Sequence, residues 1–224
     1  MATVYATTGD SYVVRTSTTS WNDAQGSATT NGTNQRSNAL NYSLGVYART
    51  IGGRGGGATY YCYRSYFPFD LSGESGTIDS ATISIYLDRL GSSGNSATAM
   101  LVKATALDDG VEDHGNVFSS GTTWHDDVSS IVIVSTAAGY HDFSLNSDGI
   151  AHLQSAIDSS GTATFGLVSN HYDYSENTPT SGGDYSKFQV YYTEYVNIIR
   201  DPKVDITYVT VAVTDNATFF GANF

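Results

Sequence analysis

Hydrophobic and polar residues alternate along most of this chain. Between residues 79 and 89, Ala81, Ile83, Ile85 and Leu87 occupy every second position, and serine, threonine and tyrosine lie between them. A period of two is typical of a β-strand with one face in a core and the other facing solvent. Similar runs separated by Gly-, Asn-, Asp- and Ser-rich turns predict strands over residues 42–51, 60–71, 79–89, 97–107, 130–135, 139–145, 163–169, 187–193 and 203–214.

Only residues 147–158 break this alternation. Ile150, Leu153 and Ile157 recur there at helical spacing, Ser147 or Asp148 is available as the N-cap, and a glycine follows the end. We therefore predict one short helix that closes an end of the sandwich. Its histidine, His152, is expected to face solvent.

Eight to ten antiparallel strands in one unit predict an all-β fold, an antiparallel β-sandwich of the jelly-roll type. Residues 1–208 form the predicted domain, with loops over 16–41 and 52–57. A strand near residue 12 follows Gly9-Asp10-Ser11, so that tripeptide does not have the strand-to-helix turn that an esterase serine needs. Residues 209–224 extend beyond the last expected domain strand as a tail for anchoring or packing.

Composition narrows the function classes. The 224 residues contain 10 Lys+Arg against 22 Asp+Glu, a net charge of −12, and only 14% are charged, against about 25% in ordinary soluble domains. A nucleic-acid partner is excluded because it would require clustered cations. The single cysteine, Cys62, excludes an internal disulfide, and no apolar run is long enough to span a membrane. The abundance of Ser, Thr, Asn, Gly and Tyr is typical of an extracellular or virion β-protein, yet the first ten residues do not have the pattern of a signal peptide. This combination suits a phage particle protein, which is assembled in the cytoplasm and freed by lysis, so we expect a virion protein.

The sequence predicts no catalytic residues. The five histidines are scattered, and the glycine-rich loop at 52–57 does not have the Lys-Ser/Thr of a phosphate loop. No cofactor is expected. A structural Ca²⁺ is the open alternative to solvated carboxylates at one acidic loop, whose candidate ligands are Asp108, Asp109, Glu112 and Asp113.

Aromatic side chains are the richest chemical resource, with 17 Tyr, 9 Phe and 2 Trp. Such rings stack on sugars when exposed, and plug the ends of a sandwich when buried. The candidates in loop-like segments are Trp21, Trp124, Tyr172 and Tyr174. Four aromatic residues alternate along one predicted strand and are expected in the core: Tyr61, Tyr63, Phe67 and Phe69.

Several segments together resemble DNRLRE-type and related carbohydrate-binding-module-like jelly-roll domains, in a stand-alone form similar to phage structural proteins. They are an opening Gly9-Asp10 strand, Arg-Ser-Tyr-Phe-Pro-Phe-Asp-Leu-Ser at 64–72, Thr-Ile-Asp-Ser-Ala-Thr at 77–82, a helix before Phe-Gly-Leu-Val at 165–168, and Asp-Pro-Lys-Val-Asp-Ile-Thr-Tyr at 201–208. The resemblance covers residues 9–208. It implies the fold and a link to polysaccharide binding, and it implies no catalytic residues.

The leading hypothesis is a non-enzymatic virion structural protein: a capsid decoration, head fibre or tail-associated jelly roll. Its partners would be other virion proteins, further copies of itself and a host-surface polysaccharide, without membrane insertion. A free-standing secreted carbohydrate-binding module is the alternative, and an enzyme such as a polysaccharide lyase is a third. The predicted anchor residues are Val209, Val211, Val213, Phe219, Phe220 and Phe224.

Overall fold

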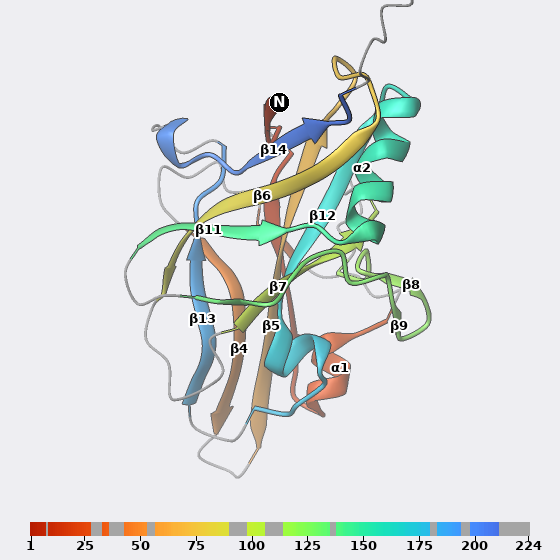
Figure 1. Cartoon of the computed structure of the whole chain (residues 1–224). Coiled ribbons are helices and arrows are strands. Elements are labelled where there is room, and N and C mark those ends of the chain that lie inside the picture. Colours follow the sequence, from red (N-terminus) through yellow and green to blue (C-terminus); the bar gives the residue numbers. More distant parts are fainter. Residues whose placement is uncertain are drawn as a thin grey trace, which may run out of the picture.

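The structure is a computed structural model (Figure 1) that describes residues 1–7, 9–27, 33–35, 43–52, 57–89, 98–105, 114–134, 138–179, 183–193 and 198–210. Strands dominate the described residues. They are β1 (Ala2–Tyr5), β2 (Ser11–Ser17), β3 (Thr33–Gln35), β4 (Ser43–Gly52), β5 (Ala58–Asp70), β6 (Ile78–Arg89), β7 (Thr98–Ala104), β8 (Phe118–Ser120), β9 (Thr123–Trp124), β10 (Val132–Ile133), β11 (Gly139–Ser144), β12 (Thr162–Ser169), β13 (Gly183–Val190) and β14 (Lys203–Tyr208). The α-helices are α1 (Trp21–Gln25) and α2 (Ser147–Asp158), with a π-helical turn at Asn170–Tyr174 and a 3-10 turn at Ile198–Arg200.

The strands form two antiparallel layers. In one layer, β6 pairs with β14 on one edge and β11 on the other, and β1 pairs with β14. In the other layer, β5 pairs with β2 on one edge and with β4 and β12 on the opposite edge, and β7 follows β12. Strand β13 pairs with both β4 and β6 and so joins the layers. This confirms the predicted all-β sandwich.

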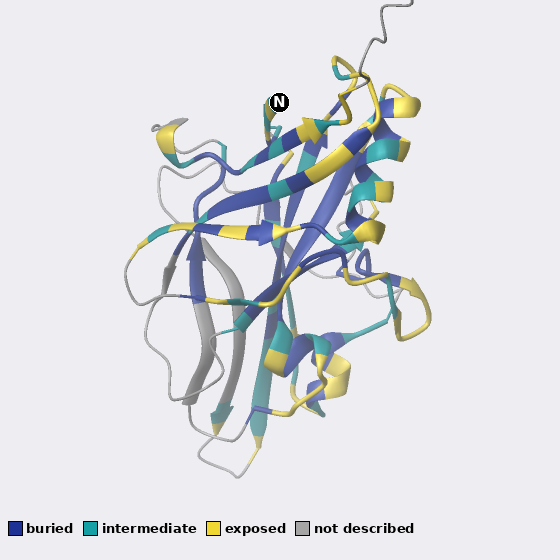
Figure 2. Cartoon of the chain, viewed as in Figure 1, coloured by how far each residue is buried: buried dark blue, intermediate teal, exposed yellow. Residues whose placement is uncertain are grey.

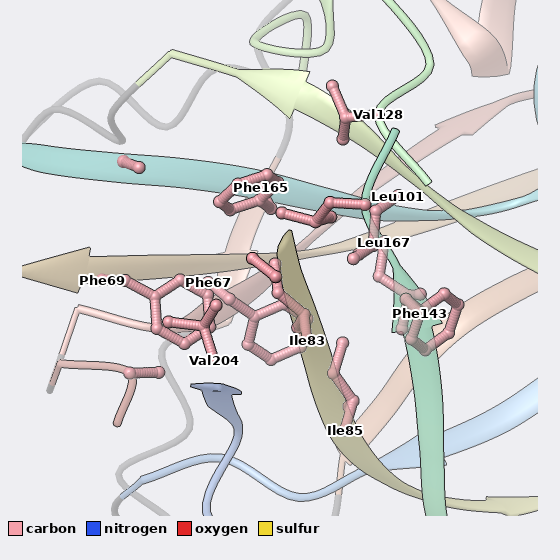
Figure 3. Packing of buried hydrophobic residues seen from close by; sticks show 14 of the residues in the cluster. Phe67, Phe69, Ile83, Ile85, Leu101, Val128, Phe143, Phe165, Leu167 and Val204 are labelled. Atoms are coloured by element: carbon pink, nitrogen blue, oxygen red, sulfur yellow. The ribbon is translucent and has the colours of Figure 1, made fainter. Parts of the chain in front are cut away.

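The core lies between the layers. Phe67 and Phe69 of β5 face Ile83 of β6 and Val204 of β14, and Phe165 of β12 lies beside them (Figure 3). All five side chains are buried completely. The alternation at 79–89 is confirmed, because Ala81, Ile83, Ile85 and Leu87 are all buried. Figure 2 shows buried residues in dark blue along β6 and along the neighbouring strands.

The prediction for the aromatic strand is partly wrong. Phe67 and Phe69 are in the core, whereas Tyr61 and Tyr63 are only half-buried. At this end of β5, the buried face changes to Cys62, Arg64 and Tyr66. Strand β5 therefore switches the face that it buries midway along its length, which a single period of two does not predict.

Helix α2 has the predicted length but a different N-cap. The side chain of Asn146 accepts hydrogen bonds from the backbone N–H groups of Asp148 and Gly149, at 3.0 Å each. The cap therefore lies one residue before Ser147. Asparagine is as good a cap as serine or aspartate, so the sequence alone did not discriminate between them.

His152 corrects the expectation of a solvent-facing residue. Its ring is half-buried and lies edge-on to Phe165, with centroids 5.1 Å apart. Its Nε2 lies 2.9 Å from the carbonyl oxygen of Thr164. Because α2 packs on β12, a residue at the flank of the helix is also partly covered. Burial accordingly lowers the pKa of His152.

The predicted loop at 16–41 contains two elements, α1 and β3. Ser20 caps α1 by accepting a hydrogen bond from the backbone N–H of Asp23 at 3.1 Å. Trp21 and Ala24 anchor this short helix in the interior. Five residues are too few to show a helical period, so only the Ser-x-x-Asp pattern signalled it.

Candidate functional site

The four aromatic candidates predicted from the sequence all lie in one region, at the end of the sandwich that carries α1 (Figure 1). They form two pairs. The indole Nε1 of Trp21 donates a hydrogen bond to the carbonyl oxygen of Tyr172 at 3.1 Å. The rings of Trp124 and Tyr174 lie 5.1 Å apart. The tertiary structure thus brings Trp21 to Tyr172, which is 151 positions further along the chain.

The two pairs differ in exposure. Trp21 and Tyr172 are only 2% and 8% exposed and pack with Ala24 and Cys62 in a small hydrophobic cluster. They plug the end of the sandwich and present no ring to a ligand. Trp124 and Tyr174 are half-buried, so part of each side chain reaches the surface.

A pocket of about 130 Å³ opens beside Trp124. It lies between α1, the β8–β9 hairpin and the segment that follows the π-helical turn. Its lining consists of Asn22, Gln25, Gly26, Phe118, Thr122, Trp124 and Glu176. Gln25 and Phe118 are buried and form the floor, whereas Asn22, Thr122 and Glu176 are exposed at the rim. The pocket therefore combines an indole wall with amide, hydroxyl and carboxylate groups at its mouth.

A buried charged centre supports the pocket from behind. Arg64 of β5 is completely buried, and its Nε and Nη2 donate to the two carboxylate oxygens of Asp173 at 2.6 Å each. Its Nη1 donates to the carbonyl oxygen of His114 at 2.7 Å. Burial opposes the positive charge, but Asp173 outweighs this effect and raises the pKa of Arg64. The guanidinium is therefore permanently charged and held in one orientation.

His114 completes this centre as a neutral ring. Its Nε2 lies 3.2 Å from the carbonyl oxygen of Cys62, which can only accept, so Nε2 carries the proton. Its Nδ1 is then free to accept from Arg64 Nη1 at 3.2 Å. Burial, and next the charge of Arg64, lowers the pKa of His114 well below its usual value, consistent with the neutral form.

The charged centre also holds the aromatic wall. The guanidinium carbon of Arg64 lies 4.9 Å from the ring centroid of Phe118 and 5.0 Å from that of Trp124. Cation–π contacts at this distance are favourable, particularly when they are shielded from water. Gln25 joins the same assembly, because its amide donates to the carbonyl oxygen of Asp173 at 2.7 Å.

Sequence reasoning did not identify Arg64, Asp173 or His114 as a centre. The period of two gave no signal of it, because it placed Arg64 on the face opposite the expected core residues. Once the structure shows that Arg64 is buried, an acidic partner is required. The partner, Asp173, is 109 positions away, so its identity could only come from the tertiary structure.

Irregular backbone adjoins the pocket. The π-helical turn Asn170–Tyr174 contributes Asp173 to the charged centre, and Glu176 follows it with a φ of +56°. Turns of π-helix and left-handed non-glycine residues are uncommon and concentrate at functional sites. Glu176 is therefore held at the rim by a specific local conformation.

Most of the remaining sequence candidates lie outside the described residues. Asp108, Asp109, Glu112 and Asp113 lie outside the described residues, as do Val211, Val213, Phe219, Phe220 and Phe224. Val209 is described and is 49% exposed. Among the described residues, no three His, Cys, Asp or Glu side chains lie close enough to hold a metal ion. None of the described helices is long and apolar enough to cross a membrane.

Comparison with known proteins adds no relative to this picture. No protein-family model matches the sequence, and no curated protein matches it. The interpretation of the pocket therefore depends on its own geometry and chemistry.

Proposed function

We propose that this chain is a non-enzymatic β-sandwich module that binds carbohydrate in the pocket beside Trp124. The observation that carries the proposal is the combination of a half-buried indole wall with exposed amide, hydroxyl and carboxylate groups at the rim. A sugar ring has apolar C–H faces and a hydroxylated edge. An aromatic wall suits the faces and hydrogen-bonding side chains suit the edge. The resemblance to carbohydrate-binding-module-like domains agrees with this proposal.

The residues that line the pocket support binding without catalysis. Glycoside hydrolysis generally uses two carboxylates on opposite sides of the scissile bond. Glu176 is the only carboxylate among the described residues that line the pocket, and no histidine lines it. The buried centre behind the pocket already uses Asp173 to neutralise Arg64.

The supporting contacts favour affinity by preorganisation. Arg64 holds Trp124 and Phe118, and Gln25 joins α1 to the π-helical turn. A site built in advance loses less conformational entropy when a ligand binds.

The first test is a glycan-array screen of the purified chain, followed by titration of the best glycan against Trp124→Ala. We expect the variant to lose at least about tenfold in affinity, equivalent to about 1.4 kcal/mol, because an aromatic anchor is removed. Isothermal titration calorimetry would measure the change.

Two control variants separate binding from folding. Asn22→Ala changes an exposed rim residue, so we expect weaker binding with an unchanged melting temperature. Tyr5→Ala removes a 52% exposed ring of β1, outside the pocket, and should leave affinity unchanged. Equal affinity of Trp124→Ala and the unmodified chain would contradict the proposal.

We further propose that the module is a structural component of a virus particle, attached through its C-terminal segment. The supporting observation is an arrangement in space: the C-terminal end of β14 lies at the end of the sandwich opposite α1 (Figure 1). Val209, which follows β14, is exposed. Attachment beyond residue 209 would leave the pocket directed away from the particle. The partners would be other virion proteins or further copies of this chain.

The attachment proposal predicts the effect of replacing Phe219, Phe220 and Phe224 together with serine. If the segment serves attachment, the fold should persist, whereas incorporation into particles should be lost. Circular dichroism and particle sedimentation would report the two properties separately. Undiminished incorporation would refute attachment through the tail. If the chain is a monomer that binds glycan, and the triple substitution changes neither its oligomeric state nor its glycan binding, a free-standing secreted carbohydrate-binding module would be supported instead.

A further inference from the structure

We infer that the pocket recognises an uncharged terminal sugar residue and discriminates against acidic sugars. This inference rests on the proposed carbohydrate-binding function and specifies its ligand class. Three properties of the pocket carry it: its size, its closed floor and the sign of its charge.

The size of the pocket limits its occupant to one sugar residue of a glycan. The pocket has a volume of about 130 Å³, whereas sites for drug-sized ligands usually measure about 300–1,000 Å³. The space therefore suits a single sugar ring, and further residues of a glycan would lie outside the pocket.

The floor favours the end of a glycan chain over its interior. Gln25 and Phe118 close the bottom of the pocket and are each 6% exposed. Beneath them lies the completely buried guanidinium of Arg64. An internal residue has neighbours on both sides and needs a groove that is open at both ends. A terminal residue has a neighbour on one side only, so its free side can enter a pocket that is closed at the bottom.

The charge of the pocket disfavours acidic sugars. Glu176 is the only ionisable side chain among the described residues that line it. The nearby cation offers no compensation, because Arg64 Nε, Nη1 and Nη2 already donate to Asp173 and His114. The carboxylate of a uronic acid would approach Glu176 without a cationic partner. Like charges without a partner disfavour binding.

The experiment compares matched oligosaccharides that differ only in their terminal residue. The probes are pairs ending in galactose or galacturonate and in glucose or glucuronate, together with extended versions in which one galacturonate is added to the same neutral terminus, so that the neutral residue becomes internal. We expect at least tenfold tighter binding of the neutral terminus than of the matched uronate. We also expect binding to weaken at least tenfold when the terminus is extended.

Glu176→Gln tests the origin of the charge selectivity. Because Glu176 is exposed, this variant should keep its melting temperature and lose most of the discrimination against uronates. Asp148→Asn removes the same charge from an exposed position on α2 and should keep the discrimination. This pair separates a local effect of Glu176 from the net charge of −12.

The outcomes distinguish this inference from the proposed function. Equal binding of neutral and uronate termini, or undiminished binding of extended chains, would overturn the inference while carbohydrate binding stands. Selectivity that Asp148→Asn abolishes as strongly as Glu176→Gln would also overturn it. Binding of none of the probes or array glycans would overturn the proposed function, and the inference with it.

Discussion

Replacing Asp173 with asparagine is expected to lower the free energy of unfolding by about 3–5 kcal/mol, the usual cost of breaking a buried ion pair by removing one partner. Asp173 is 2% exposed and accepts two hydrogen bonds from Arg64. An asparagine would leave the buried guanidinium without a negative partner. The side-chain NH2 group of the asparagine would also replace one of the two carboxylate oxygens that accept hydrogen bonds from Arg64.

This loss should be measured by urea unfolding at neutral pH, with Asp205→Asn as the matched control. Asp205 accepts a hydrogen bond from Lys203 at 2.9 Å, but both side chains are partly exposed. Solvent-screened pairs contribute about 0–1 kcal/mol, so the control should change little. Similar small losses in both variants would show that the charged centre does not stabilise the fold.

The same substitution links stability to the pocket. Arg64 contacts the rings of Trp124 and Phe118, and the π-helical turn that carries Asp173 leads directly to Glu176. We therefore expect Asp173→Asn to disturb both the wall and the rim. The Asp173→Asn unfolding measurement should precede any binding measurement on that variant.

Replacing Phe67 with alanine is expected to lower the free energy of unfolding by about 3–5 kcal/mol. Phe67 is completely buried in the main core and its ring stacks on Tyr192 at a centroid distance of 5.8 Å. Truncation removes apolar area from the core and leaves a cavity that rigid sheets fill poorly. The loss should appear as a lower urea midpoint with an unchanged slope.

Ile133→Ala provides the control for Phe67→Ala. Ile133 is 77% exposed on the short edge strand β10, so its truncation should change stability by no more than about 0.5 kcal/mol. A loss at Ile133 equal to that at Phe67 would mean that β10 is covered in solution. A negligible loss at Phe67 would contradict the placement of β5 in the core.

Local pattern was a good guide wherever one face of an element meets the main core. The alternation of Ala81, Ile83, Ile85 and Leu87 predicted β6, and the helical spacing of Leu153 and Ile157 predicted α2. Such patterns can be recognised because each side chain of these elements faces either the core or the solvent, and its polarity matches that environment. Pattern was less informative at α1, where a single turn of helix is held by Trp21.

The aromatic candidates show the limit of this approach. The sequence predicted that Trp21, Trp124, Tyr172 and Tyr174 were either ligand-binding or end-plugging residues. Trp21 and Tyr172 are buried and plug the end of the sandwich, whereas the half-buried Trp124 and Tyr174 stay candidates for ligand binding. An aromatic residue in a loop has the same sequence pattern in either role. Only the residues that surround it in the folded structure determine whether its ring is buried or exposed.

By itself, the sequence determined the all-β class, most strand positions, the long helix and the acidic, cation-poor character of the chain. These properties follow from local periodicity and composition. The tertiary structure alone decided that Arg64 pairs with Asp173, that α1 faces the β8–β9 hairpin, and that Glu176 stands at the rim of their pocket. The physical reason is that such contacts join residues far apart in the chain, and their energies depend on burial and distance, which only the folded arrangement supplies.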